Sequence, residues 1–160
     1  MADAIRVNNN QLSWGSIRLT CDTELFTGFT GISYADKRER VKAWGMGRHQ
    51  APRGRSSGKY STDPVKLTGW KDAIQSLIEG LAKRAADQRS YGNVEFTISV
   101  IYSEPPHPPT SVLITGCVII EQSASEEESA DPLKEELEID CMAIRRNGLT
   151  LFDSSELVPV

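Results

Sequence analysis

The sequence predicts a mainly β fold with one α-helix, in which two packed antiparallel sheets form a β-sandwich or barrel. Three observations predict this class. Most apolar segments alternate with polar residues at the period of a half-buried strand. One segment, beginning after residue 68, instead places its apolar residues at helical spacing. Turn signals separate the strand-like segments, and half-buried strands of this kind pack their apolar faces against one another.

Length and composition fit one domain. With 160 residues, of which 39% are hydrophobic and 25% charged, the chain can form a compact core, and we expect residues 1–160 to make a single domain. The first ten residues have neither the apolar stretch of a signal peptide nor the length of a membrane span. We therefore expect a protein that is made and kept in the cytosol.

The first half of the chain contains a series of expected strands. In the first of them, Ile17 and Leu19 lie on one face and polar residues lie on the other. Pro64 must lie at a sheet edge or a bulge, because proline has no amide hydrogen to donate. The strands expected here are 16–22, 29–34, 38–44 and 60–67.

The expected helix begins after Thr68, a good N-cap residue, and closes at 90–92, where Gly92 can end it. Its apolar residues follow the spacing of a single helical face, so we expect it to cover one side of the sheets. The residues expected on the buried face are Trp70, Ile74, Leu77, Ile78, Leu81 and Ala85.

Strand patterns return in the second half. A stiff proline-rich connector at 105–109 interrupts them, and Asn147 followed by Gly148 is a strong signal for a two-residue hairpin turn. The strands expected here are 94–102, 111–122, 133–145 and 149–152.

Neither a catalytic site nor a metal site is expected. His49 and His107 lie in a basic stretch and a proline run, with no catalytic motif around either. Cys21, Cys117 and Cys141 are isolated in apolar, strand-like surroundings, so we expect them in the core of a protein kept reduced. The sequence therefore predicts no enzyme, no cofactor and no metal.

Charged residues are segregated along the chain, although the net charge is only −4. An extended basic loop is expected at 36–60, because residues 37–60 contain eight basic residues, one acid and several glycines. Residues 121–140 contain nine acids and a single lysine, with an acidic loop expected at 121–132. Two surfaces of opposite sign on one molecule can bind head to tail, and such contacts build rings or open filaments.

The basic loop has three interpretations. It resembles Arg/Gly segments that grip nucleic-acid phosphates, or it is a solvated and variable excursion. In the third interpretation it lies across a neighbouring subunit and pairs with acids there. We favour the third, because the acidic strand would oppose nucleic-acid binding by a single molecule. The residues expected at this subunit interface are Arg48, Arg53, Arg55, Lys59 and Trp44.

The tryptophans and the acids complete the candidate surfaces. Trp14, Trp44 and Trp70 are expected to anchor the core, and Trp44, which borders the basic loop, is alternatively an interface anchor. In 136–140 the acids alternate with apolar residues, so carboxylates line one face of a strand and repel phosphate. The acidic residues expected at an interface or along a channel are Glu126, Glu127, Glu128, Asp131, Glu136, Glu138 and Asp140.

The order of these features resembles the phage tail tube proteins, particularly those of contractile tails, and the fold is similar to the tube of type VI secretion systems. The likeness spans nearly the whole chain. The segments that carry it are 28–34 (GFTGISY) followed by 39–40, then 44–48 (WGMGR), 52–60 (PRGRSSGKY), the helix, 94–102, 116–119 (GCVI), 131–134 (DPLK), 136–144 and 147–148.

The resemblance implies a β-sandwich or barrel with one flanking helix, six copies of which close into a ring. Stacked rings would form a hollow conduit for DNA ejection, with the loop at 36–60 reaching a neighbouring subunit or the adjoining ring. The implied partners are further copies of the chain and the tail sheath, baseplate or initiator, and tail terminator proteins. DNA would pass through the lumen without specific binding, and no membrane partner is implied. Departures from the family pattern, the acidic segment 125–131 and the long connector at 105–109, leave open which loops face the sheath or baseplate.

The sequence thus predicts a structural subunit of a phage tail tube, located in the virion and assembled in the host cytoplasm. One alternative is a small nucleic-acid-binding module that uses the Arg/Gly-rich loop. The other is a tube protein of a phage-derived secretion or contractile injection system.

Overall fold

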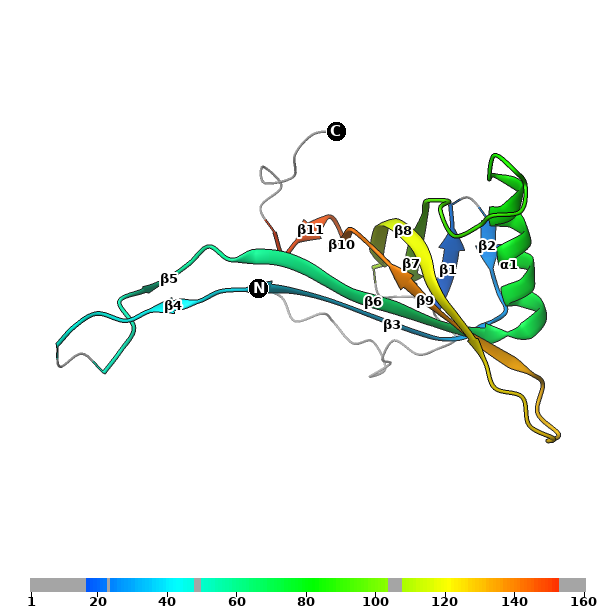
Figure 1. Cartoon of the computed structure of the whole chain (residues 1–160), viewed down its shortest axis with the longest axis horizontal. Coiled ribbons are helices and arrows are strands. Elements are labelled where there is room, and N and C mark those ends of the chain that lie inside the picture. The colour runs from blue at the N-terminus through cyan, green and yellow to red at the C-terminus, as the bar shows by residue number, and fades with distance from the viewer. Residues whose placement is uncertain (1–16, 23, 48–49, 104–107, 153–160) are drawn as a thin grey trace.

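The computed structural model describes residues 17–22, 24–47, 50–103 and 108–152. It confirms the predicted fold class, since strands dominate and one helix, α1, packs beside them (Figure 1). In chain order the elements are β1 (Ile17–Cys21), β2 (Glu24–Phe26), β3 (Phe29–Glu39), β4 (Lys42–Ala43), β5 (Gly54–Arg55), β6 (Lys59–Trp70), α1 (Lys71–Lys83), β7 (Phe96–Tyr102), β8 (Thr110–Ala124), β9 (Lys134–Asp140), β10 (Ala143–Arg146) and β11 (Leu149–Thr150).

The main sheet has the strand order β2-β1-β7-β8-β9-β6-β3, and its neighbouring strands are all antiparallel. The long strand β8 belongs to both halves of this sheet, because its first part pairs with β7 and β10 and its last part pairs with β9. Side chains from the two halves meet in one core. The predicted arrangement of two packed sheets is therefore produced by one sheet that folds back on itself.

Gly116 marks the corner of this fold in β8. Its φ is +67°, and a Cβ at this position would lie 2.5 Å from Cγ of Met142. The facing chain breaks at the same level, between β9 and β10, where the Met142 amide donates to the carbonyl of Thr115. The single strand predicted at 133–145 is therefore wrong, because the corner divides it into two.

The core follows the alternation in the sequence. Ile98 and Val100 of β7 and Leu137 and Ile139 of β9 are fully buried, and α1 adds Ile74 with its neighbours at helical spacing. Complete burial of each such side chain stabilises the fold by roughly 1.5–3 kcal/mol. The apolar pattern of the strands thus accounts for where the core lies.

The predicted helix boundaries are wrong at both ends. Thr68 is not an N-cap but part of β6, where it pairs with Gly31 on one side and Glu136 on the other. The helix instead begins at Lys71, and it ends at Lys83, well before the predicted stop at 90–92. Pairing on both sides of β6 prevents the chain from turning earlier, since tertiary pairing overrides local capping preferences.

Strands β3 and β6 form a long hairpin that leaves the body of the molecule, and β4 and β5 continue it toward its tip (Figure 1). Pro64 lies where the register between β3 and β6 shifts, so the predicted bulge is confirmed. The segment expected as a loop at 36–60 therefore contains paired strands, with β3 and β6 at its base and β4 and β5 further out. We call residues 37–60 the basic arm.

The hairpin of β8 and β9 projects at the opposite end of the molecule (Figure 1). Because β8 continues to Ala124, the loop expected at 121–132 occupies residues 125–133, which we call the acidic loop. The predicted turn at Asn147 and Gly148 joins β10 to β11, with φ of 52° and 79°. In the described part of the chain, no helix is long and apolar enough to cross a membrane.

Candidate functional site

Backbone hydrogen bonds within the basic arm, and close packing at two of its glycines, fix the path of the chain there. The amide of Arg53 donates to the carbonyl of Ala43 over 2.8 Å. A Cβ at Gly58, where φ is +84°, would lie 2.1 Å from the carbonyl oxygen of Glu39, and one at Gly45 would overlap the side chain of Arg53. The arm therefore has a defined shape rather than that of an open loop.

The cations of the basic arm point to solvent. Arg53, Arg55 and Lys59 are exposed, and no carboxylate of the described residues forms an ion pair with any of them. Lys37, nearer the core, lies 3.9 Å from Asp63. The fourth predicted cation, Arg48, lies outside the described residues, as do both histidines. The arm thus presents positive charge at Arg53, Arg55 and Lys59 that no described carboxylate neutralises.

The arm also presents large apolar side chains. Trp44 is 63% exposed, Met46 is 97% exposed, and Val41 is exposed as well. The expectation that Trp44 anchors the core is wrong, because β4 lies on the arm, far from the sheet body (Figure 1). Its alternative role as an interface anchor stays a prediction. Trp70 is half-buried with the ammonium of Lys134 5.0 Å from its ring centroid, and Trp14 lies outside the described residues.

A buried polar cluster lies at the root of the arm. The side chain of Asp36 is only 3% exposed, and its carboxylate accepts hydrogen bonds from Arg146 over 2.8 Å and from the hydroxyl of Tyr60 over 3.0 Å. The same hydroxyl accepts from the amide of Ile144, and burial raises the pKa of Tyr60 to about 12. This cluster ties the arm to β10. The sequence gives little indication of this cluster, because there Asp36 looks like the first residue of a polar loop.

Strand β9 carries acids on one face, as predicted. Glu136 and Glu138 are half-exposed, Asp140 is exposed, and the residues between them are buried. Glu138 lies opposite Glu121 of β8 and opposite Lys66 of β6. A hydrogen bond between the two carboxyl groups raises the pKa of Glu138. Whether this face lines a channel or an interface stays a prediction.

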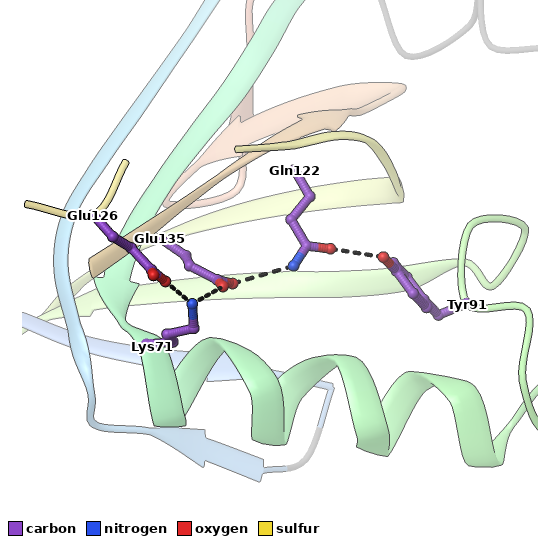
Figure 2. Close-up of polar contacts among 5 residues, drawn as sticks. All are labelled: Lys71, Tyr91, Gln122, Glu126 and Glu135. Atoms are coloured by element: carbon purple, nitrogen blue, oxygen red, sulfur yellow. Dashed lines mark hydrogen bonds and ion pairs between the residues drawn. The ribbon is translucent and has the colours of Figure 1, made fainter. Parts of the chain in front are cut away.

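A second polar cluster, built around one buried carboxylate, lies at the base of the acidic loop (Figure 2). The side chain of Glu135 is 8% exposed, lies 3.5 Å from the ammonium of Lys71, and accepts a hydrogen bond from Gln122 over 3.1 Å. Tyr91 donates to the other end of the Gln122 amide over 2.6 Å. Glu126 also pairs with Lys71. Sequence reasoning missed Glu135, because it counted only as one acid among nine.

The predicted acids of the loop divide into two groups. Glu126 pairs with Lys71 of its own chain, so part of its charge is already neutralised. Glu127, Glu128 and Asp131 are exposed, and none of them pairs with a cation of the described residues. These three therefore carry the free negative charge at this end of the molecule.

The cysteines lie in the core as predicted. Cys21, Cys117 and Cys141 are buried free thiols, and burial raises the pKa of Cys117 to about 12. An un-ionised thiol is a poor nucleophile and a poor metal ligand. Within 17–22, 24–47, 50–103 and 108–152, no group of His, Cys, Asp and Glu side chains is arranged to hold a metal ion.

No family model and no curated protein matches this sequence. Solved structures do match its fold. A chain of the anti-feeding prophage cap, described as a tube-terminating cap, has 12% identity and a TM-score of 0.61 over 90% of this chain and 95% of that one. A chain of the PVC sheath-tube complex, from an extracellular contractile injection system, has 9% identity and a TM-score of 0.59 over 85% and 90%. A type six secretion system protein has 12% identity and a TM-score of 0.55 over 84% and 88%.

These likenesses cover the sheet, the helix and most of the chain, and they confirm the resemblance drawn from the sequence at the level of the fold. The chain therefore has the tube-protein fold found in contractile injection and type VI secretion systems.

Proposed function

We propose that this chain is a structural tube subunit that assembles with copies of itself into stacked rings and catalyses no reaction. The observation that carries the proposal is the likeness of 84–90% of the chain to solved proteins of tube-forming systems. A fold alone does not establish function. The proposal therefore also rests on the two surfaces of opposite charge at the ends of the molecule, where Arg53, Arg55 and Lys59 and Glu127, Glu128 and Asp131 form no ion pair with a described residue.

The basic arm and the acidic loop are suited to contact between copies. Arg53, Arg55 and Lys59 of one copy would meet Glu127, Glu128 and Asp131 of the next, giving charge-assisted hydrogen bonds across the interface. The two patches lie at opposite ends of the molecule (Figure 1). Such a contact is head-to-tail, and it closes into a ring when the rotation per subunit divides a full turn.

The finer details of the proposal come from the resemblance to tail tube proteins. They are six copies in a ring, stacked rings with a hollow lumen, and contacts with a sheath, a baseplate or initiator, and a terminator. The particle would be a phage tail that ejects DNA, assembled in the host cytoplasm, or a phage-derived injection or secretion system. The PVC and anti-feeding prophage chains favour the second kind of particle, since the PVC complex is an extracellular contractile injection system.

A nucleic-acid-binding module is the second candidate. The exposed cations Arg53, Arg55 and Lys59, which form no ion pair with a described residue, favour it, because neutralised phosphates contribute most of non-specific affinity. The carboxylates of β9 oppose it, since they repel phosphate. The tube subunit accounts for both patches, whereas the binding module accounts for only one.

Electron microscopy and sedimentation of the purified full chain test the proposal. We expect negative-stain images of rings or hollow cylinders in the absence of nucleic acid, and sedimenting species far heavier than a 17.7 kDa monomer. A chain that stays monomeric at high concentration, with or without nucleic acid, would contradict the tube.

A further inference from the structure

Two carboxylates are almost completely buried, although each lies where a charged projection leaves the core. The side chain of Asp36 is 3% exposed and that of Glu135 is 8% exposed. Acidic side chains are rarely buried unless they are paired, because desolvation of a charge is unfavourable. Each site therefore requires its partners, and these partners come from other elements of the fold.

The site at Asp36 joins three strands. Asp36 belongs to β3, Tyr60 to β6 and Arg146 to β10, and both donors reach the same carboxylate, one at each oxygen. The amide of Ile144 in β10 donates to the Tyr60 hydroxyl over 3.0 Å. The guanidinium of Arg146 also lies 5.8 Å from the ring of Tyr34. The hairpin is thus fastened to β10 at the point where it leaves the sheet and becomes the arm.

The site at Glu135 has the same construction on different elements. Glu135 is the second residue of β9, Lys71 begins α1, and Gln122 lies near the end of β8 (Figure 2). Lys71 also pairs with Glu126 in the acidic loop, and its amide donates to the carbonyl of Leu133 over 2.9 Å. The acidic loop is thus fastened to the helix at its base.

We propose that Asp36 and Glu135 are positioning residues for assembly, which hold the basic arm and the acidic loop in the orientations that a neighbouring copy meets. The inference rests on the proposed function. Its physical reason is preorganisation. A projection that is already ordered in the free subunit loses less conformational entropy when it binds. The same free charges on a loose projection would bind more weakly.

Amide hydrogen exchange of the full-length monomer tests the positioning directly. In Asp36→Asn, we expect exchange to accelerate about tenfold or more for amides of 36–43, 54–62 and 144, because a hydrogen bond to a charged group is lost. Amides of 125–135 should keep their rates. Glu135→Gln should show the reverse pattern, so each variant is the control for the other. Asp63→Asn is a further control, since Asp63 is an exposed acid on the same hairpin.

The assembly measurement uses the same proteins. Both Asp36→Asn and Glu135→Gln should raise the concentration at which half the protein is assembled by about tenfold or more. A second control, Leu81→Ala, lowers global stability by removing buried methyl groups near the end of α1 away from Lys71, and it should assemble like the wild type. If Asp36→Asn does not fold, Tyr60→Phe removes one of the two donors and keeps the ring.

Two results would overturn the inference. One is an amide exchange rate that rises throughout the chain, or nowhere, instead of rising near the substituted residue. The other is normal assembly of a variant in which the amides near the substituted residue do exchange faster. A wild-type chain that forms no rings would instead reject the proposed function, and the exchange data would still decide whether Asp36 and Glu135 hold the two projections.

Discussion

Single residues of the basic arm are constrained by space and backbone conformation. At Gly58, φ is +84° and a Cβ would lie 2.1 Å from the backbone oxygen of Glu39. Residues other than glycine adopt this conformation at a cost of about 1–2 kcal/mol, and the backbone contact adds to it. Gly54, four residues away, has no atom within 4 Å of the place where a Cβ would lie. Substitution at Gly58 should therefore cost more than substitution at Gly54.

We predict that Gly58→Ala distorts the arm and weakens assembly, whereas Gly54→Ala leaves assembly unchanged. The free energy of unfolding should fall by about 1–3 kcal/mol in the first variant, because of backbone strain and the contact with Glu39. Urea denaturation and sedimentation of the two proteins measure both effects. Equal behaviour of the two variants would show that the shape of the arm does not matter.

The carboxyl pair of Glu121 and Glu138 makes stability depend on pH. The hydrogen bond between them raises the pKa of Glu138 above its ordinary value of 4.5, so the folded chain holds this proton more tightly than the unfolded chain does. The stabilisation by this hydrogen bond is therefore fully present at pH values below the ordinary pKa of Glu138. It is lost as the pH rises through the raised pKa of Glu138 in the folded chain. Lys66 faces Glu138 and acts in the opposite direction, because its charge favours the ionised form.

We predict that Glu138→Gln, which imitates the protonated acid, becomes more stable relative to the wild type as the pH rises from about 4 toward 7. The measurement is the urea midpoint of both proteins across this range. Gly54→Ala, which changes no titratable group, serves as the control and should keep a constant difference from the wild type across the range. A constant difference between wild type and Glu138→Gln would contradict the shared proton.

At the scale of the elements, the arm combines charge with exposed apolar surface. Trp44 and Met46 lie on the same ribbon as Arg53 and Arg55. Aromatic and arginine side chains dominate the binding energy of many protein interfaces. An exposed tryptophan among unpaired cations is therefore a surface that fits an apolar patch with an acidic border.

We predict that reversing the arm's charge with Arg53→Glu and Arg55→Glu together abolishes assembly. The monomer should keep its free energy of unfolding within about 0.5 kcal/mol, because both side chains are exposed. Sedimentation and urea denaturation measure these effects. The control reverses two exposed cations away from the arm, Lys83→Glu with Arg89→Glu, and should assemble normally.

The same variant separates the two candidate functions. For a tube subunit, the reciprocal change Glu127→Lys with Glu128→Lys should restore assembly when it is mixed with the arm variant. For a nucleic-acid-binding module, the arm variant would lose salt-dependent affinity for single-stranded DNA and keep its oligomeric state. The second outcome would reject the tube.

The whole molecule is electrically polarised, although its net charge is only −4. The basic arm and the acidic loop project from opposite ends of its long axis (Figure 1). Like ends repel and unlike ends attract, so the arrangement disfavours a symmetric pair through one patch and favours head-to-tail contact.

We predict that assembly weakens as NaCl is raised from about 0.1 M to about 1 M, because the Debye length falls from about 10 Å to about 3 Å and screens the exposed charges. Light scattering at fixed protein concentration measures it. The unfolding midpoint of the monomer should change much less, since its core is apolar. Assembly that is unaffected or strengthened by salt would mean that apolar contacts, not charges, join the copies.

The sequence by itself determined the fold class, the core and the charge segregation. Alternation placed Leu137 and Ile139 in the core, and the Asn147 turn was predicted correctly, because both depend on residues close together in the chain. Family-level likeness was recognisable for the same reason, since the order of strands, glycines and helix is a property of the sequence. The free cations and acids were also predicted, because long charged runs cannot be buried.

Only the tertiary structure decided which charged residues are buried, where the helix begins and how the strand at 133–145 divides. Asp36 pairs with Arg146, 110 positions away in the sequence, and Glu135 pairs with Lys71, which follows the neighbouring strand β6. No local pattern reports such pairs, because the energy of burying a carboxylate depends on donors that arrive only when the chain folds. Thr68 stayed in a strand for the same reason, since its two neighbouring strands outweighed its preference for a helix cap.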